Sequence, residues 1–328
     1  MKKIAIIGTG LAGLTATKLL QNHANVTLFE KSRGVGGRLA TRRAEPYQFD
    51  HGAQFFSART AAFKDFIKPL LEEGVIEPWH VRFIEFDGSH FGNNRNWSNE
   101  HPHYVGTPSM NAFAKHIAQG LDIKRPIRIA AIGKQNQQWQ LVDDGGNDQG
   151  VFDWVILATP AEQAADIIPT TLPCYQQIKQ VEMQACFSLM LGFDKPLDLP
   201  FDAALVHNMD ISWVSVNSAK PQRQTPTSLL INSTNKWADD HIDDNRDEIM
   251  AYLCEKTSHV IGQNASKASH KTVHGWRYAN MPKQKGETHI FDATNNLALC
   301  GDYFIQGRVE AAFTSGYGLA QQLLPLCK

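Results

Sequence analysis

Three glycines near the N-terminus have the spacing that a phosphate-binding turn requires. Gly8, Gly10 and Gly13 form a G-x-G-x-x-G pattern directly after an apolar run at residues 4–7. Glycines at these places allow a tight turn, a close approach of the backbone to a pyrophosphate and close packing of a helix on a strand. Glu30 follows and could accept hydrogen bonds from ribose hydroxyls, while repelling the extra phosphate of NADP. The pattern indicates dinucleotide binding.

The apolar pattern around these residues predicts the elements that position them. Residues 4–7 fit a strand buried on both faces of a parallel sheet, and residues 11–19 fit a helix whose first N–H groups point at the phosphate. A second strand at residues 26–29 ends at Glu30. Strand, turn, helix, strand and acid together predict a Rossmann-type half, because an ordinary glycine turn needs no such combination.

A second glycine-rich loop at residues 31–38 indicates which dinucleotide is bound. The loop ends on Arg38, whose guanidinium could pair with a phosphate oxygen. Nicotinamide dehydrogenases do not usually carry such a loop. Here the chain resembles the flavoprotein group that includes monoamine oxidase and renalase, whose shared pattern is G-x-G-x-x-G, an acid and then G-G-R.

A further match to the renalase group lies at residues 50–59. That group carries D-x-G-A-Q-[YF]-[FI], and the chain reads Asp50-His51-Gly52-Ala53-Gln54-Phe55-Phe56. The resemblance implies that Ala53 and Gln54 touch the flavin and that the residues from Phe55 to Arg59 face the substrate. The alternative is a strand-to-helix corner that buries Phe55 and Phe56 in the core.

The last third of the chain completes the resemblance. Residues 297–302 are expected to form the last strand of the sheet, and a helix is expected from Gly307 to Leu324. The resemblance implies that Asp302 accepts a hydrogen bond from a ribityl hydroxyl. It also implies that Val309 lies where a helix N-terminus stabilises negative charge on the reduced flavin. An H-x-W-x-Y-A segment begins at His274 and is similar to one in renalase-like proteins.

The resemblance implies FAD as cofactor, and we expect it to be noncovalent because no cysteine lies in residues 281–291. No metal site is expected, since His101 and His103 lack a third ligand, and no side chain is assigned as catalytic acid or base. The expected cofactor-binding residues are Gly8, Gly10, Ala12, Gly13, Glu30, Lys31, Arg38, Ala53, Gln54, Ile129, Asp302 and Val309. The expected substrate-binding residues are Phe55, Phe56, Ser57, Ala58, Arg59, His274 and Tyr303.

The predicted fold class is α/β, with a Rossmann-type FAD-binding domain interleaved with an α+β substrate domain that contains an antiparallel sheet. Residues 1–60, 105–165 and 274–328 are assigned to the FAD-binding domain, and residues 61–104 and 166–273 to the substrate domain. Thr107 and Pro108 are expected to open a helix that runs through His116. The other expected elements are helices at 61–71 and 244–256 and strands at 81–86, 127–132, 139–142, 151–158, 185–193 and 228–232.

Composition restricts the class of protein. The formal net charge of -1 gives no reason to expect a nucleic-acid partner or a polybasic membrane patch. Five cysteines without a C-x-x-C pair suit a reducing compartment and packing roles, and no apolar run is long enough for a membrane helix. We therefore expect a cytoplasmic protein with no obligate protein partner.

The function that the renalase resemblance implies is oxidation of 2- or 6-dihydronicotinamide isomers of NAD(P)H. The substrate's hydride would pass to flavin N5, giving β-NAD(P), and O2 would then yield hydrogen peroxide. An FAD-dependent amine oxidase is the first alternative, and a flavoprotein hydroxylase or a non-enzymatic flavin-binding protein are others. A short-chain reductase is disfavoured although Tyr175 and Lys179 form Y-x-x-x-K, because the N-terminal glycines have different spacing.

Overall fold

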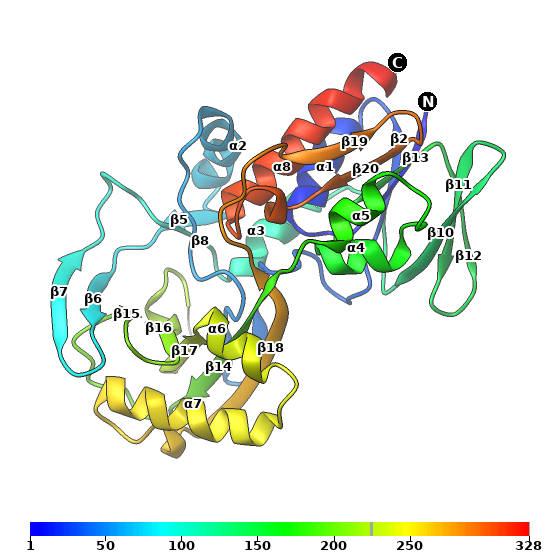
Figure 1. The fold of residues 1–328 in the computed structure, drawn as a ribbon. Helices are drawn as coiled ribbons and strands as arrows, with labels where there is room; N and C mark the ends of the chain where they lie inside the picture. The colour runs from blue at the N-terminus through cyan, green and yellow to red at the C-terminus, as the bar shows by residue number, and fades with distance from the viewer. Residues whose placement is uncertain (224–225, 328) are drawn as a thin grey trace. The chain divides into compact units, whose positions relative to one another are not determined.

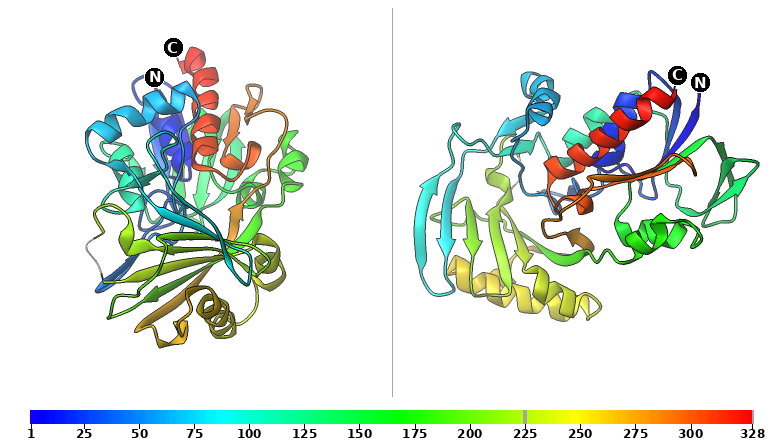
Figure 2. Two further views of the ribbon diagram at one scale, coloured as in Figure 1. Left: turned by 90° about the vertical axis from the view of Figure 1, so that its left-hand side faces the viewer. Right: turned by 45° about the horizontal axis from the view of Figure 1, so that its top comes forward.

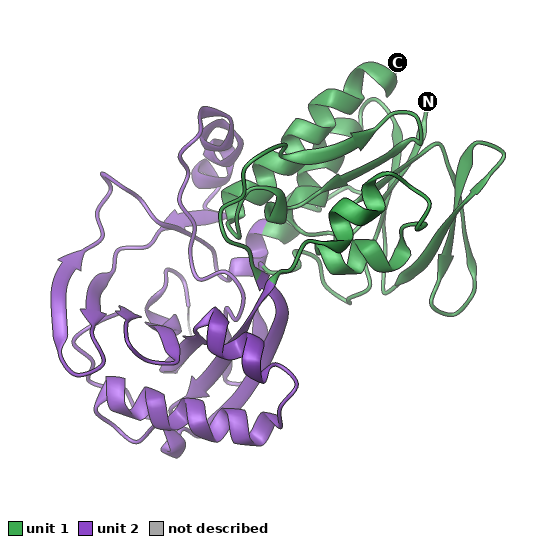
Figure 3. Ribbon diagram, in the orientation of Figure 1, with its two compact units in different colours: residues 1–38, 114–183, 280–328 green, residues 39–113, 184–279 purple. Residues whose placement is uncertain are grey.

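The computed structural model describes residues 1–223 and 226–327, and the chain divides into two compact units (Figure 1, Figure 3). Unit 1 comprises residues 1–38, 114–183 and 280–328, and unit 2 comprises residues 39–113 and 184–279. The mixed α/β fold with interleaved units confirms the predicted fold class. Among the described residues, no helix combines the length and apolarity needed to span a bilayer.

Unit 1 is built on a six-stranded sheet with the order β19-β20-β13-β1-β2-β9. Its strands are β1 (Lys3–Ile7), β2 (Asn25–Phe29), β9 (Ile123–Lys124), β13 (Trp154–Leu157), β19 (His289–Asp292) and β20 (Leu297–Cys300). All neighbours are parallel except β19, which is antiparallel to β20. The central strands β13 and β20 are buried throughout, which explains their uninterrupted apolar sequences.

The remaining elements of unit 1 include a separate antiparallel sheet of three strands. The strands of this sheet are β10 (Ile129–Gln135), β11 (Gln138–Asp143) and β12 (Asp148–Phe152). It packs on the larger sheet through Phe152, whose ring centroid is 5.8 Å from that of Phe29. The helices are α1 (Leu11–Leu20), α4 (Ala161–Ile167), α5 (Cys174–Lys179) and α8 (Val309–Leu323), with short turns of 3-10 helix at Asp302–Phe304 and Leu324–Cys327.

Unit 2 is built on a seven-stranded sheet with the order β18-β14-β17-β16-β15-β6-β7 (Figure 2). Its strands are β6 (Arg82–Phe86), β7 (Phe91–Asn96), β14 (Gln184–Gly192), β15 (Ala203–Val206), β16 (Ile211–Val216), β17 (Ser228–Ser233) and β18 (His270–Asn280). A core of sheet residues, including Phe187 and Ile231, packs with Leu253 of α7. A second cluster places Phe49 with Met190 and Leu230.

The other elements of unit 2 lie outside this sheet. They are two strand pairs, β3 (Arg42–Ala44) with β4 (Tyr47–Phe49) and β5 (Ile76–Pro78) with β8 (Tyr104–Gly106), the helices α2 (Ala61–Glu72), α6 (Asn235–His241) and α7 (Arg246–Ile261), and 3-10 turns at Asn217–Ala219 and Ala265–Lys267. Helix α3 (Met110–Ile117) begins in unit 2 and ends in unit 1, since the boundary falls between residues 113 and 114.

The unit boundaries differ from the expected domain boundaries. Residues 39–60 and 105–113 lie in unit 2, because β4 packs on the seven-stranded sheet and β8 pairs with β5. Residues 166–183 lie in unit 1, where α5 packs against α4. Residues 274–279 lie in unit 2 because they continue β18.

Two element predictions were wrong in detail. The expected strand at 151–158 is two strands in different sheets, separated at Asp153, whose carboxylate accepts hydrogen bonds from Lys3 N (2.8 Å) and Gln138 Nε2 (2.9 Å). The helix expected from Thr107 begins at Met110. Thr107 does not cap it, because the Thr107 hydroxyl donates to Gly74 O at 2.5 Å.

Helices α1 and α8 approach one another closely in unit 1. A Cβ atom added at Gly316 of α8 would lie 2.2 Å from Ala12 O and 3.0 Å from Ala12 Cα. These atoms belong to backbone and cannot rotate away, so the contact requires glycine.

Gly316→Ala should therefore lower the free energy of unfolding by about 1 to 3 kcal/mol, the usual cost of overpacking. Gly318→Ala in the same helix is the control, because its Cβ would only meet side chains at 3.4 Å and alanine is the better helix former. Urea denaturation of both variants measures the difference. Equal stability of the two variants would contradict the close packing of α1 on α8.

Candidate functional site

The glycine turn of unit 1 has the geometry of a phosphate-binding turn. It connects β1 to α1, and Gly8 adopts a φ of 105°, which favours glycine. A Cβ atom at Gly13 would lie 2.2 Å from Gly8 O, so helix and turn need glycine to pack this closely. A Cβ atom at Gly10 would meet nothing within 4 Å. The position beside Gly10 at the N-terminus of α1 is therefore unobstructed, and the free N–H groups of a helix start favour a phosphate.

Glu30 ties the glycine turn to the second loop. Its Oε2 accepts hydrogen bonds from Thr9 N (3.1 Å) and Thr9 Oγ1 (2.5 Å), and its Oε1 accepts one from Ser32 N (2.8 Å). A carboxylate has about four acceptor positions, two on each oxygen. Oε2 already accepts two hydrogen bonds, so the remaining position is on Oε1. Glu30 thus holds both loops and retains room for one hydroxyl donor.

Arg38 and Asp302 form a bidentate salt bridge in unit 1. Arg38 Nη1 donates to Asp302 Oδ2 at 2.8 Å and Nη2 donates to Oδ1 at 2.5 Å. The Asp302 side chain is 5% exposed, whereas that of Arg38 is 32% exposed. The sequence predicted separate roles for the two residues, a phosphate for Arg38 and a ribityl hydroxyl for Asp302, and it did not predict their pairing.

The other expected cofactor residues of unit 1 lie on the same framework. Val309 is the first residue of α8, whose N-terminus has no side-chain cap. Ile129 is buried at the start of β10, next to a segment in which Ile127 N donates to Glu30 O at 2.8 Å. Ala12 is 4% exposed and lies against α8, and exposed Lys31 donates to Gln163 Oε1 at 3.0 Å.

Tyr303 does not lie where a substrate could reach it. Its side chain is 2% exposed, and its ring covers Gly301 so closely that a Cβ atom there would lie 2.4 Å away. Burial raises the pKa of Tyr303 well above its usual value, so the phenol stays protonated. The expectation that Tyr303 faces the substrate finds no support in this geometry.

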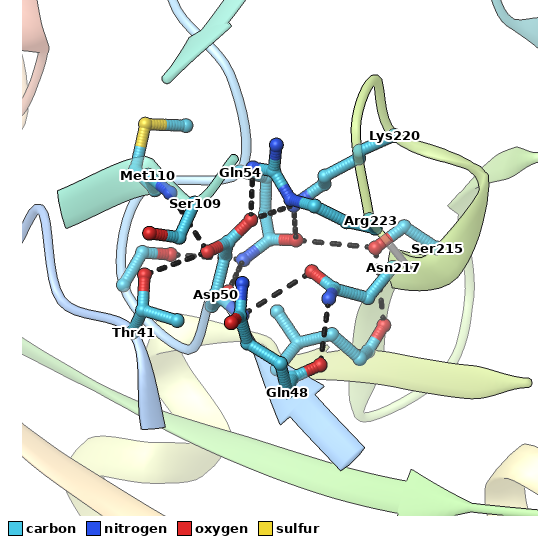
Figure 4. A network of polar contacts seen from close by, with 12 residues as sticks. Thr41, Gln48, Asp50, Gln54, Ser109, Met110, Ser215, Asn217, Lys220 and Arg223 are labelled. Carbon is cyan, nitrogen blue, oxygen red and sulfur yellow. Dashed lines mark hydrogen bonds and ion pairs between the residues drawn. The ribbon is translucent and has the colours of Figure 1, made fainter. Parts of the chain in front are cut away.

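In unit 2, the segment at residues 50–56 is anchored by the buried carboxylate of Asp50 (Figure 4). Asp50 Oδ2 accepts from Arg223 Nη2 at 2.6 Å and lies 3.5 Å from Lys220 Nζ. Asp50 Oδ1 accepts from Thr41 Oγ1 (2.7 Å) and from Met110 N (2.9 Å), the first amide of α3. These cations and hydrogen bonds hold the pKa of Asp50 below its usual value although burial alone would raise it.

The side chain of Gln54 is fully occupied within unit 2. Its Nε2 donates to Asp50 O (2.6 Å) and Gly52 O (2.9 Å). Its Oε1 accepts from Ser215 Oγ (3.1 Å) and Lys220 Nζ (3.2 Å). Because an amide has two donors and two acceptor positions, the Gln54 side chain has no hydrogen bond left to offer a cofactor.

Phe55 and Phe56 have different environments. Phe56 is 4% exposed and packs on Phe63 and Phe113, so the core alternative is the one that fits it. Phe55 is partly exposed and belongs to an aromatic cluster that we define as Phe55, Trp97, His103 and Trp213. Of the other expected substrate residues in this segment, Ser57 and Ala58 are partly exposed and Arg59 is exposed.

Polar and charged groups accompany the aromatic cluster. Trp97 and His103 stack with centroids 3.8 Å apart, and buried His103 Nδ1 and Trp213 Nε1 have no hydrogen-bond partner among the described residues. Burial lowers the pKa of His103, a hydrogen bond with the His101 backbone opposes the shift, and the nearby charges of Arg95 and Arg59 add to it. The cluster therefore combines flat apolar faces, unsatisfied ring nitrogens and nearby cations.

His274 lies in a second aromatic group of unit 2. Its ring is 5.1 Å from that of His51 and 4.4 Å from that of Trp276, whose Nε1 donates to His51 O at 2.8 Å. Burial lowers the pKa of His51 and of His274 to about 4, with Arg42 adding to the effect on both. Both imidazoles are therefore neutral at physiological pH, and neither supplies a positive charge to a ligand.

The sequence did not reveal Lys220 and Arg223 as site residues. They belong to a polar stretch after β16 that reads as an ordinary surface loop, and only the tertiary structure buries them against Asp50. The one available signal was Asp50 itself, because a carboxylate in a segment of small and apolar residues needs a compensating cation.

Comparisons with known proteins agree with this fold. Residues 6–70 match a family described as NAD(P)-binding Rossmann-like domain, and residues 62–324 match the family described as flavin containing amine oxidoreductase. Wild-type putrescine oxidase bound to putrescine superposes with a TM-score of 0.71 at 12% identity over 99% of both chains. A triple mutant of that enzyme gives 0.74 at 13% identity, again over 99% of both chains. At such identities the likeness concerns the fold.

Curated relatives align over short segments. The prenylcysteine oxidase 1-like protein of Mus musculus is 35% identical over 95 residues, which are 27% of this chain and 18% of that protein. An L-amino-acid oxidase of Siganus canaliculatus is 40% identical over 70 residues, 20% of this chain and 13% of that protein. The alignments thus span less than a fifth of these relatives.

The Rossmann-type unit, its glycine turn and the family match define a flavin-dependent oxidoreductase with FAD as cofactor. The chain belongs to the flavin containing amine oxidoreductase family. The open space beside Gly10 and the uncapped start of α8 are compatible with FAD.

Glu30→Gln should weaken FAD binding by about 1 to 3 kcal/mol, because one amide nitrogen would face a donor where a carboxylate oxygen now accepts. Asp144→Asn, on an exposed hairpin of unit 1, is the matched control. Release of FAD fluorescence on dilution measures the dissociation constant. Unchanged affinity in Glu30→Gln would remove Glu30 from the cofactor site.

Proposed function

We propose that this flavoprotein oxidises 2- or 6-dihydronicotinamide isomers of NAD(P)H to β-NAD(P), with O2 as the electron acceptor. The observation that carries the proposal is the aromatic cluster of unit 2, which lies among arginines. A dihydronicotinamide dinucleotide is a flat heterocycle attached to phosphates, and it needs a stacking surface and cations.

The charges near the aromatic cluster favour an anionic substrate over a cationic amine. Arg95 places its guanidinium 4.8 Å from the centroid of Phe83, whose ring stacks on Trp97 at 5.5 Å. Arg95 also lies 4.0 Å from Glu85 Oε1, a distance at which an exposed pair neutralises it only in part. The carboxylate of Asp50 is buried against Arg223 and Lys220 and is not available to bind an ammonium group.

Within this proposal, the residues of unit 1 hold the cofactor. The turn from Gly8 to Gly13 and the start of α1 receive the pyrophosphate, and Glu30 accepts from a ribose hydroxyl. Arg38 and Asp302 supply a phosphate partner and a ribityl acceptor, and the N-terminus of α8 at Val309 stabilises negative charge. Ile129 borders the adenine, with Ala12 and Lys31 beside the phosphates.

The residues of unit 2 orient the substrate. The partly exposed rings of Phe55, Trp97 and Trp213 would supply the surface on which the nicotinamide ring stacks. Arg59 lies on the same segment as Phe55 and would pair with a phosphate.

The reaction requires little acid or base catalysis from the protein. The dihydronicotinamide gives up one C–H bond, with its proton and two electrons, and becomes aromatic, while O2 takes two electrons and two protons, one from solvent, to form hydrogen peroxide. Bound FAD supplies the two-electron acceptor that O2 regenerates.

Amine oxidation remains the second candidate because the family includes amine oxidoreductases. The aromatic cluster could enclose a neutral amine as well as a nicotinamide. The two candidates differ in the charge and shape of the substrate, so direct reduction of the bound flavin distinguishes them.

The test is anaerobic mixing of the holoenzyme with a preparation enriched in the 2- and 6-dihydro isomers, while the flavin absorption is followed. We expect rapid bleaching by the isomers and none by 4-dihydro-NADH, putrescine or L-amino acids. Arg95→Gln and Arg59→Gln should each raise the concentration for half-maximal rate about five-fold or more, with Arg43→Gln, at an exposed position of β3 in unit 2, as control. Bleaching by amines and not by the isomers would overturn the proposal.

A further inference from the structure

The buried cluster around Asp50 carries more positive than negative charge. The side chains of Asp50, Lys220 and Arg223 are all fully buried, and both cations approach the same carboxylate oxygen. Arg223 is the closer of the two, at 2.6 Å, and Nη1 of Arg223 also donates to Pro221 O at 2.7 Å. One carboxylate faces two cations, so one positive charge remains in excess, and Lys220 is the less well compensated cation.

Among the described residues, the ammonium group of Lys220 has one further polar partner, the side chain of Gln54. Lys220 Nζ donates to Gln54 Oε1 at 3.2 Å, while the indole ring of Trp79 covers the ammonium at 5.4 Å. A cation can only face the oxygen of an amide, so Lys220 fixes the direction of the Gln54 side chain. Gln54 Nε2 then bonds the carbonyl groups of Asp50 and Gly52, which closes a hydrogen-bonded ring around residues 50–54 (Figure 4).

We propose that Lys220 is a positioning residue of the reaction, whose ammonium group holds residues 50–55 in their working conformation through Gln54. The inference rests on the proposed function, which places Phe55 at the substrate, and on the family resemblance, which implies that Ala53 and Gln54 touch the flavin. Without the ammonium, Gln54 Oε1 keeps only Ser215 Oγ as a donor among the described residues, and the segment that carries Phe55 is held less firmly.

The ionisation of Lys220 gives this role a pH dependence. Burial lowers the pKa of Lys220 to about 8, with Asp50 opposing the shift and Arg223 adding to it. Asp50 and Arg223 are the charged groups that act on the Lys220 ammonium. Gln54 offers it an amide oxygen, and Trp79 offers it the face of an indole ring. Above about pH 8 the ammonium loses its proton in the folded protein, whereas an arginine at this position would stay charged.

The experiment compares the holoenzyme with its Lys220→Met and Lys220→Arg variants, and with Lys195→Met, an exposed lysine of unit 2, as control. The rate of flavin reduction by the dihydro isomers is measured from pH 6 to about pH 10. In the native protein and the control we expect the rate to fall up to about tenfold per pH unit above pH 8. Lys220→Arg should keep its rate at high pH. Lys220→Met should be at least about tenfold slower at pH 7 and should lack this decline above pH 8, which we call the alkaline limb.

A second measurement needs no substrate and so separates this inference from the proposed function. The absorption spectrum of the bound, oxidised flavin is titrated over the same pH range. A spectral change near pH 8 in the native protein that is absent in Lys220→Arg supports the inference even if no isomer reduces the flavin. An alkaline limb or spectral titration that persists in Lys220→Arg, or that the native protein lacks, would overturn it. Lys220→Arg decides the question alone if Lys220→Met fails to fold.

Discussion

The compensation of one buried carboxylate determines the arrangement of unit 2. Asp50 is taken out of water completely, and such a charge is tolerated only where cations and hydrogen-bond donors surround it. Arg223, Lys220, Thr41 and the first amide of α3 meet this requirement. Segments far apart in sequence are thereby tied to residues 50–56, and Phe55 is presented to the aromatic cluster. Removing one partner would leave an uncompensated charge, so these segments depend on one another.

The glycine turn of unit 1 is held in shape by residues that lie close together in the sequence. The glycine turn can adopt its backbone shape only without side chains at Gly8 and Gly13, and Glu30 binds that turn and the following loop by three hydrogen bonds. Because these residues lie within one strand-turn-helix-strand unit, local sequence carries most of the information. This is why the chain's membership of a flavoprotein family is visible from its first 38 residues, whereas the nature of the substrate is not.

The sequence predicted the fold class and the main strands and helices, because buried parallel strands and amphipathic helices have distinct apolar periods. It failed where tertiary contacts decide. Nothing local signals that a single apolar run divides at Asp153 between two sheets, or that the first amide of α3 donates a hydrogen bond to distant Asp50. The same limit applies to the site, since Phe55 and Phe56 look alike in sequence and only the structure buries Phe56. The roles of the individual residues towards cofactor and substrate stay predictions.

The central claim is that the aromatic and arginine residues of unit 2 select a flat anion. Titration of the oxidised holoenzyme with β-NAD and, separately, with putrescine tests it most directly, because the flavin absorption reports binding without turnover. We expect β-NAD, the product of the proposed reaction, to perturb the spectrum with saturation, and its affinity to fall with added salt. Saturable perturbation by putrescine, with none by β-NAD, would contradict it.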